Sequence, residues 1–494
     1  MHMSLRFYNT LTKKKETFVP INEGKVGIYV CGITAYDVCH IGHARSALVF
    51  DVICRYLNYA GYDVTYIKNF TDVDDKIIAK AIAENSDIYD ISERYIKEHN
   101  EDMDRLGVAR PTVTPKATDN INGMIRLIDT LIEKGFAYVV DGDVYYSVEK
   151  FGEYGKLSGR GLDDMLAGAR IEVDKKKKNP FDFVLWKASK EGEPWWNSPW
   201  GRGRPGWHIE CSVMSQRFLG DTFDIHGGGE DLIFPHHENE IAQSEGATGK
   251  PFAHYWIHNG FIKINNEKMS KSLKNTLTIK EILTTCHPEV FRFFVFQSHY
   301  KSYIDFSDIS IAEARAGVER LYAVLKKIKE VLEEGADFSG ISENDLSGED
   351  EVMFKKVSML PDKFKEAMDD DFNTARAIGY IFDTVRLING YVTKDFVPTG
   401  EALFVLSEAK EQIRSVGKVL GLLLEDPDEY LEKDKKREAS KSGLDVEEIE
   451  RLINERRQAR ESKDWDRADE LRDLLAARGV VLKDTPTSTT WKIR

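Results

Sequence analysis

The fold is decided by residues 26–67, which read VGIYVCGITAYDVCHIGHARSALVFDVICRYLNYAGYDVTYI. Two short apolar runs, Val26–Val30 and Val64–Ile67, predict buried strands, and the residues between them have the spacing of a helix. A strand, a helix and a second strand in this order form a βαβ unit, which builds parallel sheets. We therefore predict an α/β chain with a Rossmann-like parallel sheet.

The loop before the predicted helix carries His40-Ile41-Gly42-His43. A helix start offers unpaired N–H groups and a partial positive charge that suit phosphate oxygens, and two imidazoles add donors. Far along the chain, Lys268-Met269-Ser270-Lys271-Ser272 puts two ammonium groups and two hydroxyls on one segment, which we expect to be an exposed loop. A cationic loop suits a departing pyrophosphate. The two strings together predict a chain that handles ATP phosphates and activates a carboxylate.

Composition limits the class of protein. The 494 residues exceed one compact core, and 41% hydrophobic with 31% charged residues is typical of globular proteins. No apolar run is long enough to span a membrane, and no signal peptide is evident at the N-terminus. Five scattered cysteines disfavour a disulfide framework. We expect a cytoplasmic protein without membrane partners.

Changes of pattern divide the chain into parts. We expect the first half of the sheet domain at 1–120, a connective insertion at 121–205, the second half at 206–262 and a loop-bearing region at 263–309. A helical bundle follows at 310–425, then a charged linker at 426–444 and a small α+β unit at 445–494. Residues 435–494 hold 15 Lys and Arg against 13 Asp and Glu, so this end is locally basic on an acidic chain of net charge −14. Charge alone favours a solvated helical surface there over an RNA-binding patch.

Four residues of metal-ligating type are candidates for one site. His236 and Glu240 are four apart and share a face if they lie on a helix. Two thiolates, Cys31 at the end of the first predicted strand and Cys211, would complete a tetrahedral zinc site. The spacing is not that of a zinc finger, and a cysteine on a strand is more often a small buried hydrophobe. The residues alone therefore leave zinc open, although the absence of His-Glu-x-x-His excludes that metalloprotease motif.

Longer strings narrow the interpretation. The two phosphate-handling strings resemble the signatures of class I aminoacyl-tRNA synthetases, and further strings closely resemble the cysteinyl-tRNA synthetase family over essentially the whole chain. These further strings are YVCGITAYD (29–37), NFTDVDDK (69–76), GWHIECS (206–212), HGGGEDL (226–232), FPHHENE (234–240), HYKS (299–302), DDFNT (370–374), GVVL (479–482) and TW (490–491).

The resemblance implies one zinc ion per chain, held by Cys31, Cys211, His236 and Glu240, that binds the substrate thiolate directly. The physics agrees, because zinc favours a thiolate over the harder and barely acidic hydroxyl of serine. We therefore expect no editing domain, and the insertion at 121–205 is too short to be one.

The resemblance also implies roles for the remaining site residues. The amino-acid pocket is lined by Gly32, Thr71 and Trp207, although ordinary core is an equal interpretation of Trp207. Asp231 matches a ribose-contacting position, with a turn carboxylate as its alternative. Phosphate contacts and charge stabilisation are assigned to His40, His43, Lys268 and Lys271. Glu238 is expected to be an outer-layer or exposed group.

The implied reaction is the ATP-dependent ligation of L-cysteine to tRNA(Cys) through cysteinyl-adenylate, with Mg-ATP as substrate and a monomeric enzyme. The bundle and the terminal unit would hold the tRNA body and anticodon, with Trp491 stacking on a base. Two alternatives are a cysteine-activating ligase with a small amine acceptor and a regulatory RNA-binding protein. One departure stands out: Lys274 occupies a position that is usually glycine in the family, so it either slows loop closure or adds a phosphate contact.

Overall fold

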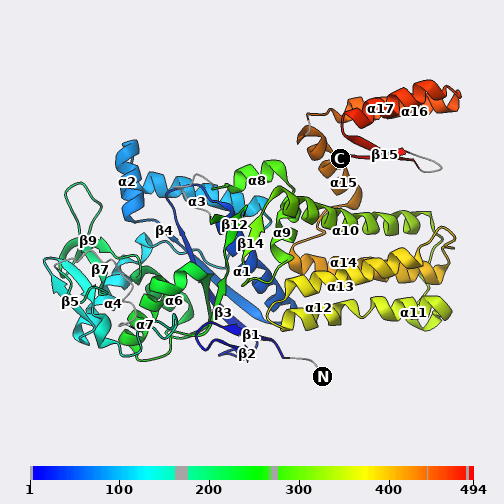
Figure 1. Cartoon of the computed structure of the whole chain (residues 1–494). Helices are drawn as coiled ribbons and strands as arrows, with labels where there is room; N and C mark the ends of the chain where they lie inside the picture. Colours follow the sequence, from blue (N-terminus) through cyan, green and yellow to red (C-terminus); the bar gives the residue numbers. More distant parts are fainter. Residues whose placement is uncertain are drawn as a thin grey trace.

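The centre of the molecule is a four-stranded parallel sheet with the order β11-β10-β3-β4 (Figure 1). The computed structural model describes residues 4–161, 176–265, 267–268, 276–441, 443–484 and 489–493. The strands are β3 Lys25–Thr34, β4 Asp63–Thr71, β10 Phe223–Gly229 and β11 Ala253–Asn259. β3 pairs with β4 on one side and with β10 on the other, so the two halves of the domain meet between β3 and β10. In such sheets ligands bind at the carboxyl ends of the strands where the two halves meet.

Helices cover both faces of this sheet. Ile28 and Val30 of β3 belong to the large core that includes α1, whereas Tyr29 and Cys31 belong to a second core that includes α6 and α7. This alternation follows from the two-residue repeat of a strand. The covering helices are α1 Ile41–Tyr59, α6 Ile209–Leu219 and α7 Glu238–Thr248. The predicted parallel α/β fold is therefore confirmed, with each face of the sheet supplying one apolar layer.

The insertion between the two halves is built on an antiparallel sheet of order β5-β6-β7-β9-β8. The residues from 76 to 106 form two helices rather than one, because Asn85 adopts a left-handed conformation with φ 48° between them. An asparagine tolerates this conformation at a helix end better than most residues do. The elements are α2 Asp75–Glu84, α3 Ile88–Arg105, η1 Thr118–Asn120, α4 Ile121–Glu133, β5 Ala137–Val140, β6 Asp143–Tyr146, η2 Val148–Lys150, β7 Phe183–Ala188, β8 Trp196–Ser198 and β9 Gly201–Pro205.

A small mixed sheet lies after the second half of the domain, with β12 between β13 and β14. Its elements and the helices near it are β12 Ile262–Ile264, β13 Glu267–Lys268, α8 Ile279–Thr285, α9 Pro288–Phe296 and β14 Ile304–Phe306. The N-terminal hairpin consists of β1 Arg6–Asn9 and β2 Lys14–Thr17.

A buried arginine helps to attach the helical bundle to the sheet domain. Arg292 of α9 forms an ion pair with Asp51 of α1 and donates to the carbonyls of Gly107 at 3.0 Å and Leu420 at 3.2 Å. It therefore ties three parts of the chain together inside a dry interface. The bundle comprises α10 Asp308–Glu334, η5 Glu343–Asp345, α11 Gly348–Val357, α12 Leu360–Asp369, α13 Thr374–Tyr391 and α14 Gly400–Leu420. Val318 and Leu325 of α10 are fully buried, so this helix contributes an apolar stripe to the core of the bundle.

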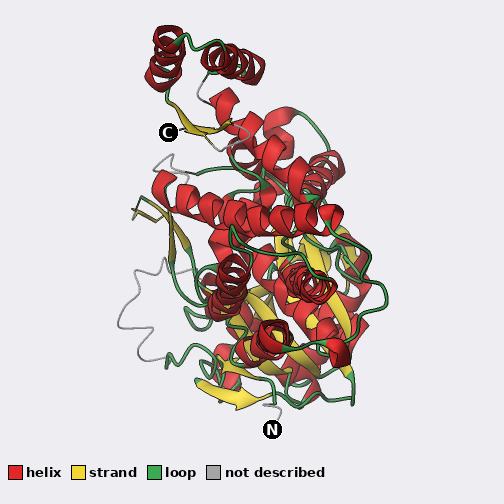
Figure 2. Ribbon diagram, turned by 90° about the vertical axis from the view of Figure 1, so that its right-hand side faces the viewer, coloured by secondary structure: helices red, strands yellow, loops and turns green. Residues whose placement is uncertain are grey.

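The terminal unit lies to one side of the bundle, beyond α10 (Figure 1 and Figure 2). It consists of α16 Val446–Glu461, α17 Trp465–Ala477 and the hairpin of β15 Val480–Asp484 with β16 Thr489–Ile493. The preceding stretch, expected as a linker, is mostly the helix α15, Pro427–Lys441, and Tyr430 stacks on Tyr322 of α10 at 3.8 Å. Among the described residues, no helix combines the length and apolarity that crossing a bilayer requires.

Candidate metal centre and nucleotide site

A bulge in β3 aims Cys31 into the space between α6 and α7. The pairing of β3 with β4 shifts register between Val30 and Ile33, so Cys31 and Gly32 together face Asn69. The Gly32 N–H donates to Asn69 Oδ1 at 2.8 Å, and a Cβ at residue 32 would lie 1.5 Å from the Asn69 carbonyl oxygen. Bulges bend a strand and redirect its side chains. Only glycine fits beside Asn69, and this glycine makes the placement of Cys31 possible.

The four predicted metal ligands lie together although they come from three separate stretches of sequence. Their ligand atoms are all within 4.8 Å of one another, and all four residues are buried. Cys31 Sγ lies 3.6 Å from Cys211 Sγ and 3.3 Å from Glu240 Oε1. His236, in the turn directly before α7, lies with Nε2 3.0 Å from the same Glu240 oxygen one helical turn on. The chemistry of the set, two thiols, an imidazole and a carboxylate, is that of a zinc site.

The pKa values of the two thiols in this cluster shift in opposite directions. Burial raises the pKa of Cys31 well above its usual value, and Cys211 and Glu240 raise it further. Burial also opposes ionisation of Cys211, but its contacts with Cys31 and His236 outweigh this and lower its pKa to about 6. Burial disfavours charge on His236 as well, yet Glu240 raises the pKa of that ring to about 10. Without a metal, these shifts favour a thiolate at Cys211 and protons on Cys31 and His236, and metal binding would displace those protons.

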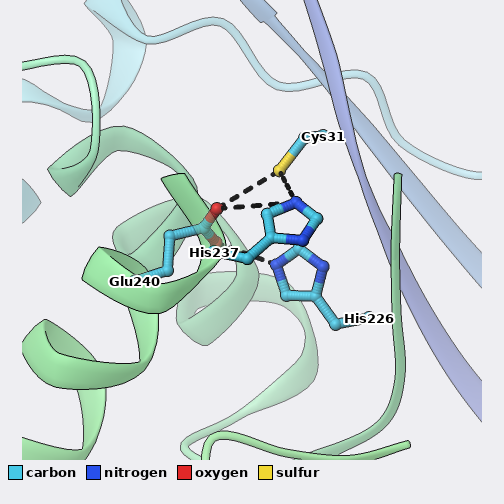
Figure 3. Close-up of side chains that lie close together, drawn as sticks. All are labelled: Cys31, His226, His237 and Glu240. Carbon is cyan, nitrogen blue, oxygen red and sulfur yellow. Dashed lines mark hydrogen bonds and ion pairs between the residues drawn. The ribbon is translucent and has the colours of Figure 1, made fainter. Parts of the chain in front are cut away.

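Two further histidines approach the same centre, and sequence reasoning did not single them out. Figure 3 shows the His237 ring pointing at Cys31, with the His226 ring next to it and facing the Glu240 carboxylate. His237 Nε2 lies 3.3 Å from Cys31 Sγ, and His226 Nε2 lies 2.8 Å from Glu240 Oε2. Cys31, His226, His237 and Glu240 thus form a second set with metal-ligand spacing. The sequence does show two adjacent histidines, His236 and His237, and a third, His226, within a predicted strand. Their positions in the sequence do not indicate which ring faces the cysteines.

An outer layer of histidines orients the inner rings. His236 Nδ1 lies 2.9 Å from His208 Nδ1, and His237 Nδ1 lies 2.9 Å from His258 Nε2. Burial lowers the pKa of His208 well below its ordinary value and that of His258 to about 3, so both rings are neutral. A partner on one ring nitrogen fixes the direction of the other nitrogen. His236 therefore presents Nε2 to the cysteines.

The predicted pocket residues border the cluster. Trp207 is 41% exposed and stacks on the His236 ring at 4.2 Å, so it is a wall of the site rather than core. Thr71, at the end of β4, donates from its hydroxyl to Glu210 Oε2 at 2.6 Å. Burial raises the pKa of Glu210 well above its usual range, although the Thr71 hydrogen bond opposes this. Thr71 and Trp207 thus flank the metal-ligand cluster.

Glu238 is part of the scaffold and not of the metal cluster. It is fully buried, and its carboxylate accepts N–H bonds from Gly155 at 2.9 Å and from Ser158 at 2.8 Å. The expectation of an exposed group is therefore wrong, and the outer-layer alternative describes it better: Glu238 fastens the insertion to α7.

The first phosphate-handling string forms the start of α1. His40 is the N-cap, and its Nδ1 accepts the Gly42 N–H at 3.1 Å, while His43 Nδ1 accepts the His40 N–H at 3.2 Å. The two rings stack at 3.8 Å. A neutral imidazole that accepts at Nδ1 carries its proton at Nε2. Both rings therefore present an N–H donor at the N-terminus of the helix.

The segment that follows the second string bonds to the backbone at the start of α1. The Ile41 N–H donates to the Leu277 carbonyl at 3.0 Å, and the Ile279 N–H donates to the Cys39 carbonyl at 3.0 Å. Lys268 contributes backbone to β13, but its side chain, Lys271 and Lys274 lie outside the described residues. Asp231 occupies the exposed turn Glu230–Leu232 at the carboxyl end of β10.

Comparisons with known proteins agree with this geometry. The family model described as the catalytic domain of class I (C) tRNA synthetases matches residues 17–316, well over half of the chain. The chain belongs to the cysteine–tRNA ligase family. Its identity to the cysteine–tRNA ligase of Geobacter metallireducens is 58% and to that of Pelobacter propionicus 55%, covering 100% of both chains in each comparison.

Other parts of the chain match the same family. Residues 363–425 match a DALR domain, and residues 446–491 match a cysteinyl-tRNA ligase anticodon binding domain. Among solved structures, methionyl-tRNA synthetase of Mycobacterium tuberculosis in complex with methionyl-adenylate aligns with a TM-score of 0.60 at 13% identity. That alignment covers 82% of this chain and 93% of the other and shows a shared fold. The parallel sheet of this cysteine–tRNA ligase family member is thus the class I synthetase architecture.

Proposed function

We propose that this chain charges tRNA(Cys) with L-cysteine through a cysteinyl-adenylate and selects the amino acid at a zinc ion. One observation carries the proposal: the buried Cys31, Cys211, His236 and Glu240 set lies at the sheet edge where the His40 loop starts α1. The proposed thiol-binding site therefore lies close to the proposed phosphate-binding site.

The donor set with two thiols, Cys31, Cys211, His236 and Glu240, is the one we assign to zinc. We place His226 and His237 around this ligand set, where His226 bonds the other oxygen of Glu240 and His237 faces Cys31. When bound, the ion supplies a Lewis acid that prefers a thiolate to a hydroxyl. A site that demands such a ligand rejects serine without a hydrolytic editing step.

Carboxylate activation is assigned to the phosphate-handling strings. The Nε2–H donors of His40 and His43 and the first turn of α1 bind the ATP phosphates. Asp231, at the end of β10, is the candidate for the ribose hydroxyls, and Lys268 and Lys271 stabilise charge on the pyrophosphate as it leaves. Catalysis then comes from positioning and electrostatics, with the cysteine carboxylate attacking the α-phosphorus of Mg-ATP directly.

Recognition of tRNA is assigned to the bundle and the terminal unit. The expectation that Trp491 stacks on a base is wrong, because this ring is 5% exposed and is covered by the Lys435 ammonium at 4.0 Å. Its Nε1 donates to Glu450 Oε1 at 2.7 Å, as a buried indole requires. Trp465, 57% exposed at the start of α17, is the aromatic surface that this unit offers to a base.

The enzyme is proposed to act as a monomer in the cytoplasm. All five cysteines are free thiols in the structure, which suits a reducing compartment.

One assay separates this proposal from its alternatives. Cysteine-dependent ATP–pyrophosphate exchange is measured first, and charging of tRNA(Cys) is then measured with the same preparation of protein. Exchange without charging favours a ligase with a small amine acceptor, and the absence of both favours an RNA-binding protein. Zinc analysis of the purified protein tests the metal independently, with one ion per chain as the expected result.

A further inference from the structure

Glu210 is a buried acid beside the proposed cysteine site. It lies in the first turn of α6, directly before Cys211, and is 1% exposed. An acidic residue is favoured in a first helical turn, but such residues are ordinarily solvated. Within the described ranges, no Lys, Arg or His nitrogen forms an ion pair with its carboxylate, and the Thr71 hydroxyl donates to its Oε2 at 2.6 Å.

The neighbouring acids are committed to backbone or hydroxyl donors. Asp72 accepts from the Thr118 N–H at 3.0 Å with one oxygen and from the Thr118 hydroxyl at 2.5 Å with the other. Asp74 caps α2 by accepting the Lys76 N–H at 2.9 Å. Asp72 and Asp74 thus hold the backbone after β4 in place. In the described part of the chain, Glu210 makes no comparable bond to the backbone, so a role in the scaffold does not explain why it is buried.

The orientation of Thr71 converts this acid into part of a cation subsite. The Thr71 hydroxyl donates its proton to Glu210 Oε2, so toward any other group its oxygen acts as an acceptor. The Thr71 hydroxyl oxygen and the Glu210 carboxylate therefore both offer acceptors. An ammonium group, which has three donors and no acceptor, complements them.

Glu210 and Thr71 are each tied to the thiol cluster, Glu210 through the adjacent Cys211 and Thr71 through Asn69 on the same face of β4. Asn69 and Thr71 lie two residues apart on β4, so their side chains share a face about 6.6 Å apart. Cys211 Sγ lies 3.7 Å from Asn69 Oδ1, and Glu210 meets Thr71, so the thiol and the acid mark the two ends of this step. In cysteine, two carbons separate the sulfur from the ammonium nitrogen. A substrate sulfur held beside Cys211 therefore directs its ammonium toward Thr71 and Glu210.

We propose that Glu210, together with Thr71, binds the α-ammonium group of cysteine. The inference rests on the proposed function and deepens it: the cysteines and His236 recognise the thiol, and Glu210 recognises the other end of the same amino acid. The sequence did not single out this residue, because an acid in a first helical turn has an ordinary explanation.

Three thiol compounds separate the contributions of the ammonium and carboxylate groups to the affinity for cysteine. L-Cysteine carries both the ammonium and the carboxylate, cysteamine lacks the carboxylate, and 3-mercaptopropanoate lacks the ammonium. Their dissociation constants are measured by calorimetry on the wild-type holoenzyme and on Glu210→Gln, which keeps the size and an acceptor for Thr71. Zinc content and thermal midpoint are recorded for both proteins, and Thr71→Val provides a second variant.

We expect Glu210→Gln to weaken cysteine and cysteamine by about 10- to 100-fold, since hydrogen bonds to a charged group are lost. Binding of 3-mercaptopropanoate should change by less than about 2-fold, because it makes no ammonium contact. Thr71→Val should also weaken cysteine and cysteamine more than 3-mercaptopropanoate, but by a smaller factor than Glu210→Gln does. Equal losses for all three thiols, or no loss for cysteine, would overturn the inference. A wild-type holoenzyme that binds no cysteine would overturn the proposed function, and this inference with it.

Discussion

Replacing Gly32 with alanine tests whether the β3 bulge builds the metal centre. The added Cβ would meet the Asn69 carbonyl oxygen at 1.5 Å, whereas real Cβ contacts stay above 3.0 Å. The two strands must therefore move apart by roughly 1.5 Å, and no side-chain rotation relieves a clash with backbone. Metal–ligand distances tolerate only about 0.2 Å of error. Cys31, the residue beside the clash, cannot then remain a ligand.

Two magnitudes follow from this geometry. Overpacking against backbone should destabilise the protein by about 3 kcal/mol. Zinc affinity should fall by more than about 100-fold, beyond what loss of an outer-layer contact costs. Zinc is measured by metal analysis after dialysis against a weak chelator, and stability by thermal unfolding.

Gly379→Ala is the matched control for the same chemical change. Gly379 lies inside α13, and no atom outside its own stretch of helix lies within 4 Å of the position its Cβ would take. Alanine there should leave zinc unchanged and stabilise the helix by about 0.5–1 kcal/mol. A Gly32→Ala protein that retains one zinc per chain and wild-type affinity for cysteine would refute the role assigned to the bulge.

Three further predictions concern the ligands and the terminal unit. Cys211→Ser should lose zinc and lower cysteine-dependent pyrophosphate exchange by more than about 100-fold; retention of one zinc per chain would exclude Cys211 as a ligand. Zinc affinity of the metal-free protein should rise with pH through the neutral range, because Cys31 and His236, whose pKa values are both raised, must each lose a proton. Chelator competition at several pH values measures this, and a flat profile would contradict it. Trp465→Ala should weaken tRNA charging without changing pyrophosphate exchange, whereas Trp491→Ala should lower stability by about 3–5 kcal/mol; equal charging by wild type and Trp465→Ala would remove the proposed stacking surface.

Local pattern was sufficient for the elements around the site. The apolar run from Val26 gave a strand, and the helix after His40 begins where a phosphate-binding N-terminus was expected. The spacing of His236 and Glu240 also predicted their contact, because residues four apart on a helix meet on one face. Each of these inferences depends on neighbours within a few residues, which the sequence displays directly.

Other features depend on which distant residues become neighbours. The bulge at Gly32 depends on the Asn69 backbone opposite it, and the burial of Trp491 depends on Lys435 in a helix that was expected to be a linker. No local pattern contains such pairs, because they are created when strands and helices pack.

The sequence by itself determined the family, the parallel-sheet architecture and the residue types available for phosphate and thiol chemistry. Only the tertiary structure decided which side chains meet: it brought Cys31 to Cys211, added His226 and His237 around them, and enclosed Glu210 against Thr71. The physical reason is that motif identity is encoded by spacing along the chain. The geometry and charge of a buried site are instead set by packing between segments that are far apart in sequence.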